Sequence, residues 1–244
     1  MLAIFKKEIN QFFSSITGYV AIILFLLANG LLLFVFPDTS LLDAGYANLD
    51  PLFELAPMIY LLLIPAITMR SFADEYKTGT MELLSTKPLT WWQIVMGKFW
   101  ASLLIVLISL LPTFVYYFAI QQLSATPVRL DTGGITGSYI GLFLLGAIFT
   151  AIGCWASSLS NNAVVAFLVA VFTCFIFYNG FDALSKLTVF TGGADYYLQM
   201  AGIKFHYTSI SRGVIDSRDV VYFISVTGFI LYLSKISLQR KIWQ

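Results

Sequence analysis

Six long apolar runs constrain this chain more than any other feature of its sequence. Each run is about 18 to 22 residues long, the length that an α-helix needs to cross the hydrocarbon core of a bilayer. The runs are Ile16–Phe36, Leu52–Met69, Phe99–Ile120, Ile135–Ala156, Ala163–Phe181 and Val220–Leu238. Of the 244 residues, 59% are hydrophobic and only 11% are charged, whereas soluble domains carry about 25% charged residues. We therefore predict an all-α, polytopic membrane protein with six transmembrane helices.

The first 15 residues predict an amphipathic helix that lies at the membrane interface. Apolar side chains recur at helical spacing, and polar side chains occupy the opposite face. The apolar set is Phe5, Ile9, Phe12 and Phe13, and the polar set is Lys6, Lys7, Asn10 and Gln11. A cleavable signal peptide is the alternative interpretation. We reject it because the apolar run that follows is long enough to span and lacks a small-residue cleavage site.

The distribution of basic residues predicts the orientation of the spans. With the N-terminus in the cytoplasm, the inner side receives nine of the 14 basic residues. These are Lys6, Lys7, Arg70, Lys77, Lys87, Lys98, Lys235, Arg240 and Lys241. The first outer loop, residues 37–51, contains aspartates and no lysine or arginine. Under the positive-inside rule, both termini and the segment 70–88 are therefore predicted to be cytoplasmic.

The segment from Arg70 to Pro88 is a charged island between the second and third apolar runs. It holds three acidic and three basic residues. Thr80 is a suitable N-cap, and Glu82 then lies in the first turn, where the helix dipole favours an anion. The residue before Pro88 is pushed out of the α region, so the helix must end by Lys87. We expect a short, rigid helix of about two turns, although an ordinary charged turn is the alternative.

Details of this segment suggest how it could act. Gly79, just before the expected cap, is a candidate for a backbone angle that other residues resist. Met81 and Leu84, three residues apart, predict one apolar edge that could enter a cleft on a partner. The next long helix is predicted to start with a capping box formed by Thr90 and Gln93. The alternative is that the carboxylates are merely solvated and the glycine merely marks a turn.

Two other regions carry structural expectations. Gly137 and Gly141, four residues apart in the fourth run, predict close helix packing, within the chain rather than in a homodimer contact. The long segment 182–219 is predicted to lie outside and to contain short helices. Cys154 and Cys174 fall in apolar runs, so we expect packing residues and no disulfide.

Absent motifs narrow the function. No ionisable residue falls in the apolar core of any run, which argues against proton relays, ion-coupled carriers and membrane metalloproteases. There is no Gly-x-x-x-x-Gly-Lys-[Ser/Thr] loop and no Gly-x-Ser-x-Gly elbow, so we expect no ATP binding and no catalysis by this chain. A single histidine, His206, argues against a His-based metal site, and no basic cluster indicates nucleic acid. We expect no cofactor, and any energy must come from a docked partner.

The charged segment resembles the signature of type-2 ABC transporter permeases. The pattern is Phe72-Ala73-x-Glu75-x-x-x-Gly79-Thr80-x-Glu82-Leu83-Leu84, followed by Pro88 and Gly97-Lys98. The resemblance covers the whole chain, 1–244, as a single permease domain. In that family this segment is the coupling helix that seats in the ATPase subunit. The coupling residues implied are Glu75, Gly79, Thr80, Met81, Glu82, Leu83, Leu84 and Pro88.

The same resemblance implies partners and a location. It implies a separate cytoplasmic ABC ATPase that binds the ATP, a second permease copy as a homodimer, and residence in the bacterial inner membrane. The stretch 206–223 is similar to a narrower branch, the gliding-motility-associated permeases, which implies a further membrane subunit with a large external domain. The expected function is an exporter permease. The alternative is a membrane anchor or mechanical component of a motility or secretion machine. A membrane enzyme is a weaker third hypothesis, and the sequence does not indicate a substrate.

Overall fold

A computed structural model describes residues 1–37, 41, 48–123, 131–188 and 193–242. All regular structure within these ranges is helical, which confirms the all-α prediction. Five helical segments are long and apolar enough to cross a membrane by themselves. A sixth is obtained when α1 (Leu2–Phe13) and α2 (Ile16–Phe34), which meet at a sharp bend, are taken as one span. The chain is therefore a multi-pass membrane protein.

The five spans that qualify by themselves are either single helices or helices joined end to end. They are α3 (Asp50–Thr68) with α4 (Arg70–Lys77); α6 (Trp91–Leu110) with the 3-10 turn η2 (Leu111–Thr113) and α7 (Phe114–Leu123); α8 (Thr132–Leu159); α9 (Ala163–Phe175) with the π-helical η3 (Ile176–Gly180) and α10 (Phe181–Ser185); and α13 (Ser217–Ile242). The short helices are α5 (Thr80–Ser85), α11 (Ala194–Ala201) and α12 (Ile203–Ser211). The last two confirm the short helices expected within 182–219.

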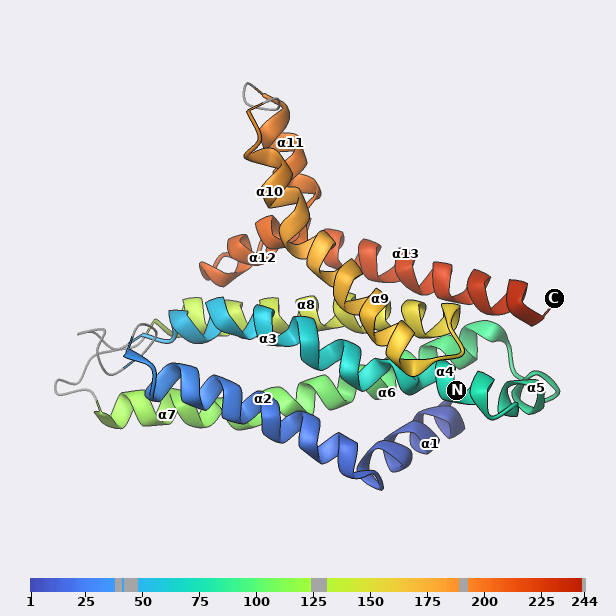
Figure 1. Ribbon diagram of the computed structural model, residues 1–244. Helices are drawn as coiled ribbons and strands as arrows, with labels where there is room; N and C mark the ends of the chain where they lie inside the picture. The colour runs from blue at the N-terminus through green and yellow to red at the C-terminus, as the bar shows by residue number, and fades with distance from the viewer. Residues whose placement is uncertain (38–40, 42–47, 124–130, 189–192, 243–244) are drawn as a thin grey trace.

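The helices form an elongated bundle with two distinct ends (Figure 1). The helices α1, α4 and α5 lie at one end, together with the C-terminal end of α13, and we call this the coupling end. The N-terminal ends of α3 and α8 lie at the other, which we call the distal end. The helices α10 and α11 project sideways from the bundle. The N-terminal helix α1 and the C-terminal end of α13 thus lie at the same end of the bundle.

The helix α8 is the centre of the bundle and packs against α3, α6, α9, α12 and α13. Small residues make these close approaches possible. A Cβ atom at Gly146 would lie 3.0 Å from Val106 of α6, and one at Gly153 would overlap the side chain of Thr68 in α3. The free cysteine Cys154 is buried beside this contact.

The predicted packing glycines both face α12 within the same chain. A Cβ atom at Gly137 would lie 2.7 Å from the carbonyl oxygen of Ile210. At Gly141 the nearest atoms are the side chains of Ile210 and Tyr207, both at 3.4 Å. The Tyr207 hydroxyl donates a hydrogen bond of 2.6 Å to the carbonyl of Phe53 in α3. Burial raises the pKa of Tyr207 well above its usual value, so the hydroxyl remains a donor.

The helix α12 is also tied to α13 and α11 through His206. Its Nδ1 lies 2.6 Å from a carboxylate oxygen of Asp219, in the first turn of α13. Its Nε2 lies 2.8 Å from the carbonyl oxygen of Met200 in α11. The ring stacks on Tyr222 with a centroid distance of 3.8 Å. These contacts hold α12 across the distal ends of α3 and α8.

The spans extend further than the hydropathy runs predicted. The capping box of Thr90 and Gln93 is confirmed, with hydrogen bonds of 3.1 and 3.3 Å, so α6 begins at Trp91. Lys98 therefore lies inside α6, and Glu54 lies inside α3. Glu54 already lay near the start of the predicted run Leu52–Met69, and Lys98 directly precedes the run that begins at Phe99, so neither residue contradicts the prediction for the apolar cores of the runs. The helix α6 includes Lys98 because Glu8 and Glu75 pair with its charge.

Candidate functional site

The first turn of α4 is fastened to α8 by one hydroxyl group. The backbone N–H groups of Phe72 and Ala73 donate to the Oγ of Ser157, at 2.9 and 3.1 Å. The same hydroxyl donates to the carbonyl of Met69 at 2.9 Å. A side chain inserted into the backbone ladder is a common cause of an irregular helix, and Met69 is the residue between α3 and α4. The α4 helix is therefore fixed to the central helix where it leaves α3.

A buried ion network joins α4 to α1 and α6. The ammonium of Lys98 lies 2.7 Å from an oxygen of Glu8 in α1 and 3.0 Å from Oε1 of Glu75 in α4. It also donates a hydrogen bond to the carbonyl of Ser71. Lys7 in α1 approaches the same Glu75 oxygen at 2.7 Å. Four charged side chains from three helices thus meet at one point.

Because the network is buried, the loss of one of its charged partners costs much stability. The Lys98 side chain is 1% exposed and that of Glu75 8% exposed, whereas that of Lys7 is 50% exposed. Removing one partner from a buried pair costs about 3–5 kcal/mol, because the remaining charge is left in a poorly solvating interior. The exposed Lys7 contributes less, because water screens it. The α4 helix therefore cannot move away from α6 without breaking the contact between Glu75 and Lys98.

The tip of the segment is the turn into α5, and its geometry differs from the prediction at Thr80. Gly79 adopts a φ of +70°, the left-handed conformation expected for it, and is itself the N-cap of α5. Thr80 is the first helical residue, and its hydroxyl contacts that of Thr78 at 3.0 Å. The predicted Thr80 cap is wrong because the glycine turn reverses the chain one residue earlier. Glu82 lies in the first turn, as expected.

The predicted apolar edge of α5 faces inward. Met81 is 3% exposed and belongs to the hydrophobic core, and Leu84 packs against that core. The expectation that this edge enters a cleft on a partner is therefore wrong for Met81, and for the half-buried Leu84 it stays a prediction. Leu83 instead points outward and is 65% exposed. The spacing of the apolar residues identified an apolar edge on the helix. It could not indicate whether that edge would pack against the chain's own bundle or stay exposed.

The predicted coupling residues thus divide into an outer and an inner group. Gly79, Glu82, Leu83 and Pro88 are exposed at the tip. Thr80 and Leu84 are half-buried. Glu75 and Met81 are buried and reach the bundle instead of the surface.

Sequence reasoning did not find the residues that pair with Glu75 and hold α4 in place. Lys7 and Glu8 lie in a helix about 70 residues away, and Ser157 lies about 80 residues away. No local pattern indicates such contacts. The one available signal was Lys98 at the start of a long apolar run. Among the described residues, no group of three or more His, Cys, Asp or Glu side chains could hold a metal ion.

The C-terminal helix also reaches this region. The ammonium of Lys241 in α13 lies 3.8 Å from the centre of the Tyr76 ring in α4. It also donates to the carbonyl of Leu159, at the end of α8. The α4–α5 segment is therefore held from several sides, while its tip stays exposed.

Comparison with known proteins gives the family. The model of the family described as "ABC-2 family transporter protein" matches residues 2–189, which include α1 and every helix as far as α10. No curated protein matches the chain. Since the family match covers more than half of the sequence and includes the whole α4–α5 segment, the chain belongs to the ABC-2 family of transporter proteins.

Proposed function

We propose that this chain is the permease subunit of an ABC-type exporter complex, in which a separate cytoplasmic ATPase binds and hydrolyses ATP. The observation that supports the proposal most is the construction of the α4–α5 segment. Its tip is exposed at Leu83, and its base is held by the contact between Glu75 and Lys98. A surface for a partner is thus connected through a short rigid element to the spans.

The proposed mechanism follows this connection. Closure of the ATPase subunits pushes on the tip, and α4 carries the displacement to α3, with which it is nearly continuous. Ser157 passes it to α8, and Lys98 passes it to α6 and α1. Helices linked in this way move as rigid bodies, and the bundle changes between inward-facing and outward-facing states.

The remaining features of the complex are part of the proposal. Family membership implies a cytoplasmic ABC ATPase and dimerisation, and we expect two copies of this chain as a homodimer. We place the complex in the bacterial inner membrane with both termini and the coupling end in the cytoplasm. The gliding-motility role and a further subunit with a large external domain rest on the similarity of residues 206–223 alone. A mechanical or assembly role without a cargo would use the same coupling segment.

The proposal is tested by docking of the ATPase. The permease should be co-expressed with its candidate ABC ATPase, and the two should be co-purified. Leu83→Asp places a charge on the exposed tip and should abolish co-purification while membrane levels stay normal. The matched control is Leu187→Asp, at a half-exposed leucine far from the coupling end. If Leu83→Asp retains the ATPase as well as the parent does, α5 is not the docking element.

A further inference from the structure

A large polar cavity lies at the distal end of the bundle, away from the coupling segment. Its volume is about 810 Å³, and α3, α8, η3 and α12 contribute to its walls. A second cavity of about 510 Å³ lies beside α12 and shares three of its residues, Lys204, Thr208 and Arg212. We call the larger one the distal cavity.

Two walls of the distal cavity carry opposite charges. Asp50, Glu54 and Met58 of α3 recur every four residues, so they form one stripe along that helix. Lys204 and Thr208 of α12 and Arg212, the residue that follows this helix, recur in the same way and line the same cavity. An acidic stripe thus faces a basic stripe across open space.

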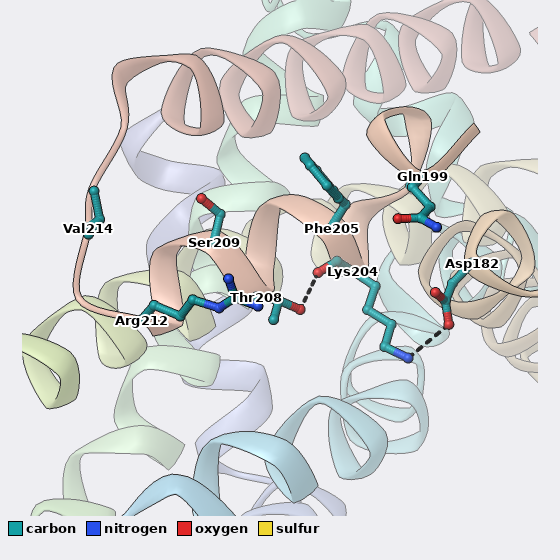
Figure 2. A pocket seen from close by; sticks show the side chains of 9 residues that line it. Asp182, Gln199, Lys204, Phe205, Thr208, Ser209, Arg212 and Val214 are labelled. Atoms are coloured by element: carbon teal, nitrogen blue, oxygen red, sulfur yellow. Dashed lines mark hydrogen bonds and ion pairs between the residues drawn. The ribbon is translucent and has the colours of Figure 1, made fainter. Parts of the chain in front are cut away.

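The two stripes do not neutralise each other. Lys204 pairs with Asp182, at 3.0 Å, on the side of α12 shown in Figure 2. Within the described ranges, neither Glu54 nor Arg212 takes part in an ion pair. The cavity therefore offers an anion on one wall and a cation on the other, with room between them for a ligand.

The Tyr178 hydroxyl points to a ligand independently of these charges. Tyr178 lines the cavity and is 4% exposed as a residue, and no hydrogen bond joins its hydroxyl to another described residue. It lies in η3, a π-helical turn, and such turns are frequent at functional sites. A ligand in the cavity would supply the hydrogen-bond partner of this hydroxyl.

The cavity continues into an apolar surface. Met58, at its inner edge, and Leu62, one turn further along α3, are 45% and 58% exposed. From Asp50 to Met58 the helix descends about 12 Å. With Asp50 at the water boundary and α3 along the membrane normal, that distance exceeds the headgroup layer of one leaflet, about 5–8 Å deep, and would place the inner edge at the depth of the acyl chains. A ligand that fits both parts is polar at one end and apolar at the other.

We propose that the distal cavity binds a zwitterionic phospholipid whose headgroup contains a primary ammonium and a phosphate, as in phosphatidylethanolamine. The ammonium lies against Asp50 and Glu54, the phosphate against Arg212 and Lys204, and the Tyr178 hydroxyl donates to the phosphate. One acyl chain follows Met58 and Leu62. This inference rests on the proposed function in making the lipid a candidate cargo, but the binding itself needs no ATPase.

Native mass spectrometry of the purified chain in detergent, without any ATPase, tests the site. The chain is mixed with equal amounts of dioctanoyl phosphatidylethanolamine, dioctanoyl phosphatidylglycerol and dioctanoylglycerol, and the bound lipid is counted. The expected order of retention is phosphatidylethanolamine, then phosphatidylglycerol, then dioctanoylglycerol. Each charge-assisted contact that is lost should reduce retention about tenfold.

Variants separate the two ends of the headgroup. Glu54→Gln should remove the preference for phosphatidylethanolamine over phosphatidylglycerol, and Arg212→Gln should weaken retention of both phospholipids. Arg218→Gln, at an exposed arginine of α13 that lines neither cavity, is the matched control and should bind like the parent. Glycerophosphoethanolamine, which has the headgroup without acyl chains, should compete at least about a hundredfold less well, because each buried CH₂ group contributes about 0.8 kcal/mol. Equal retention of all three lipids, an effect of Arg218→Gln equal to that of Arg212→Gln, or equal competition by the chain-free headgroup would overturn the proposal.

Discussion

The ammonium of Lys98 in α6 lies 3.0 Å from Oε1 of Glu75 in α4. This contact makes the charged segment between the second and third spans part of the membrane body. Because Lys98 also binds Glu8, a displacement of α4 affects the helix α1 as well. The tip of the segment is thus free to meet a partner while its base is locked to two other helices.

The first prediction concerns the stability of this network. Lys98→Met should lower the free energy of unfolding by about 3–5 kcal/mol, because Glu8 loses its partner and the buried Glu75 keeps only the exposed Lys7. The measurement is unfolding of the purified chain in detergent. Lys77→Met, which removes an exposed lysine of α4, is the control and should change stability by less than about 0.5 kcal/mol. Equal stability of the two variants would contradict the burial of the network.

The second prediction concerns the close contact between α8 and α3. Gly153→Ala introduces a Cβ atom that overlaps Thr68, and we expect a loss of about 1–3 kcal/mol. Gly228→Ala is the matched control, because no atom lies within 4 Å of the new Cβ in α13. Thermal unfolding of both variants under the same detergent conditions measures the difference. A Gly153→Ala protein as stable as the control would show that this contact is loose.

The third prediction concerns the turn into α5. Gly79 has a φ of +70°, and a branched side chain resists that conformation by about 1–2 kcal/mol. Gly79→Val should therefore weaken co-purification with the ATPase, while Gly79→Asn should retain it, since asparagine tolerates left-handed backbone. No atom would crowd a new Cβ at this position, so steric clash is not a competing cause. Parent-like docking of Gly79→Val would mean that the turn geometry is unimportant.

The fourth prediction concerns orientation. In a background lacking Cys154 and Cys174, single cysteines are placed at Tyr197 in α11 and at Thr86 after α5, both exposed positions. An impermeant thiol reagent applied to intact cells should label Tyr197→Cys and leave Thr86→Cys unlabelled until the cells are opened. The reverse pattern would invert the proposed topology and place the coupling end outside.

The sequence was sufficient to predict the five spans that qualify by themselves and their order, because apolar length and helical spacing are local properties. It also located the Thr90 capping box and the left-handed glycine at Gly79. The inward direction of Met81 could not be read from the sequence, because a short amphipathic helix can present its apolar edge to its own bundle or to a partner. Only the tertiary packing decides between these.

The polar contacts between residues far apart in the chain could not be predicted from the sequence for a related reason. From the sequence, Glu75 is expected to be a surface carboxylate in a charged segment. Only the fold, which places it opposite Lys98, shows that it forms a buried ion pair. The hydroxyl of Ser157 gave no signal either, because a serine in an apolar run usually bonds to its own helix. Ser109 does so, through the carbonyl of Val106, whereas Ser157 bonds to α4.

The central claim is that the contact between Glu75 and Lys98 transmits ATP-driven movement, and ATP turnover by the reconstituted permease–ATPase complex tests it most directly. Glu75→Gln keeps the size of the side chain but removes its charge, while Lys98 retains Glu8. We predict that this variant binds the ATPase like the parent but loses most of the increase in turnover that the permease causes, whereas Asp74→Asn, on the same helix, behaves like the parent. Parent-like binding together with parent-like turnover for Glu75→Gln would contradict the account.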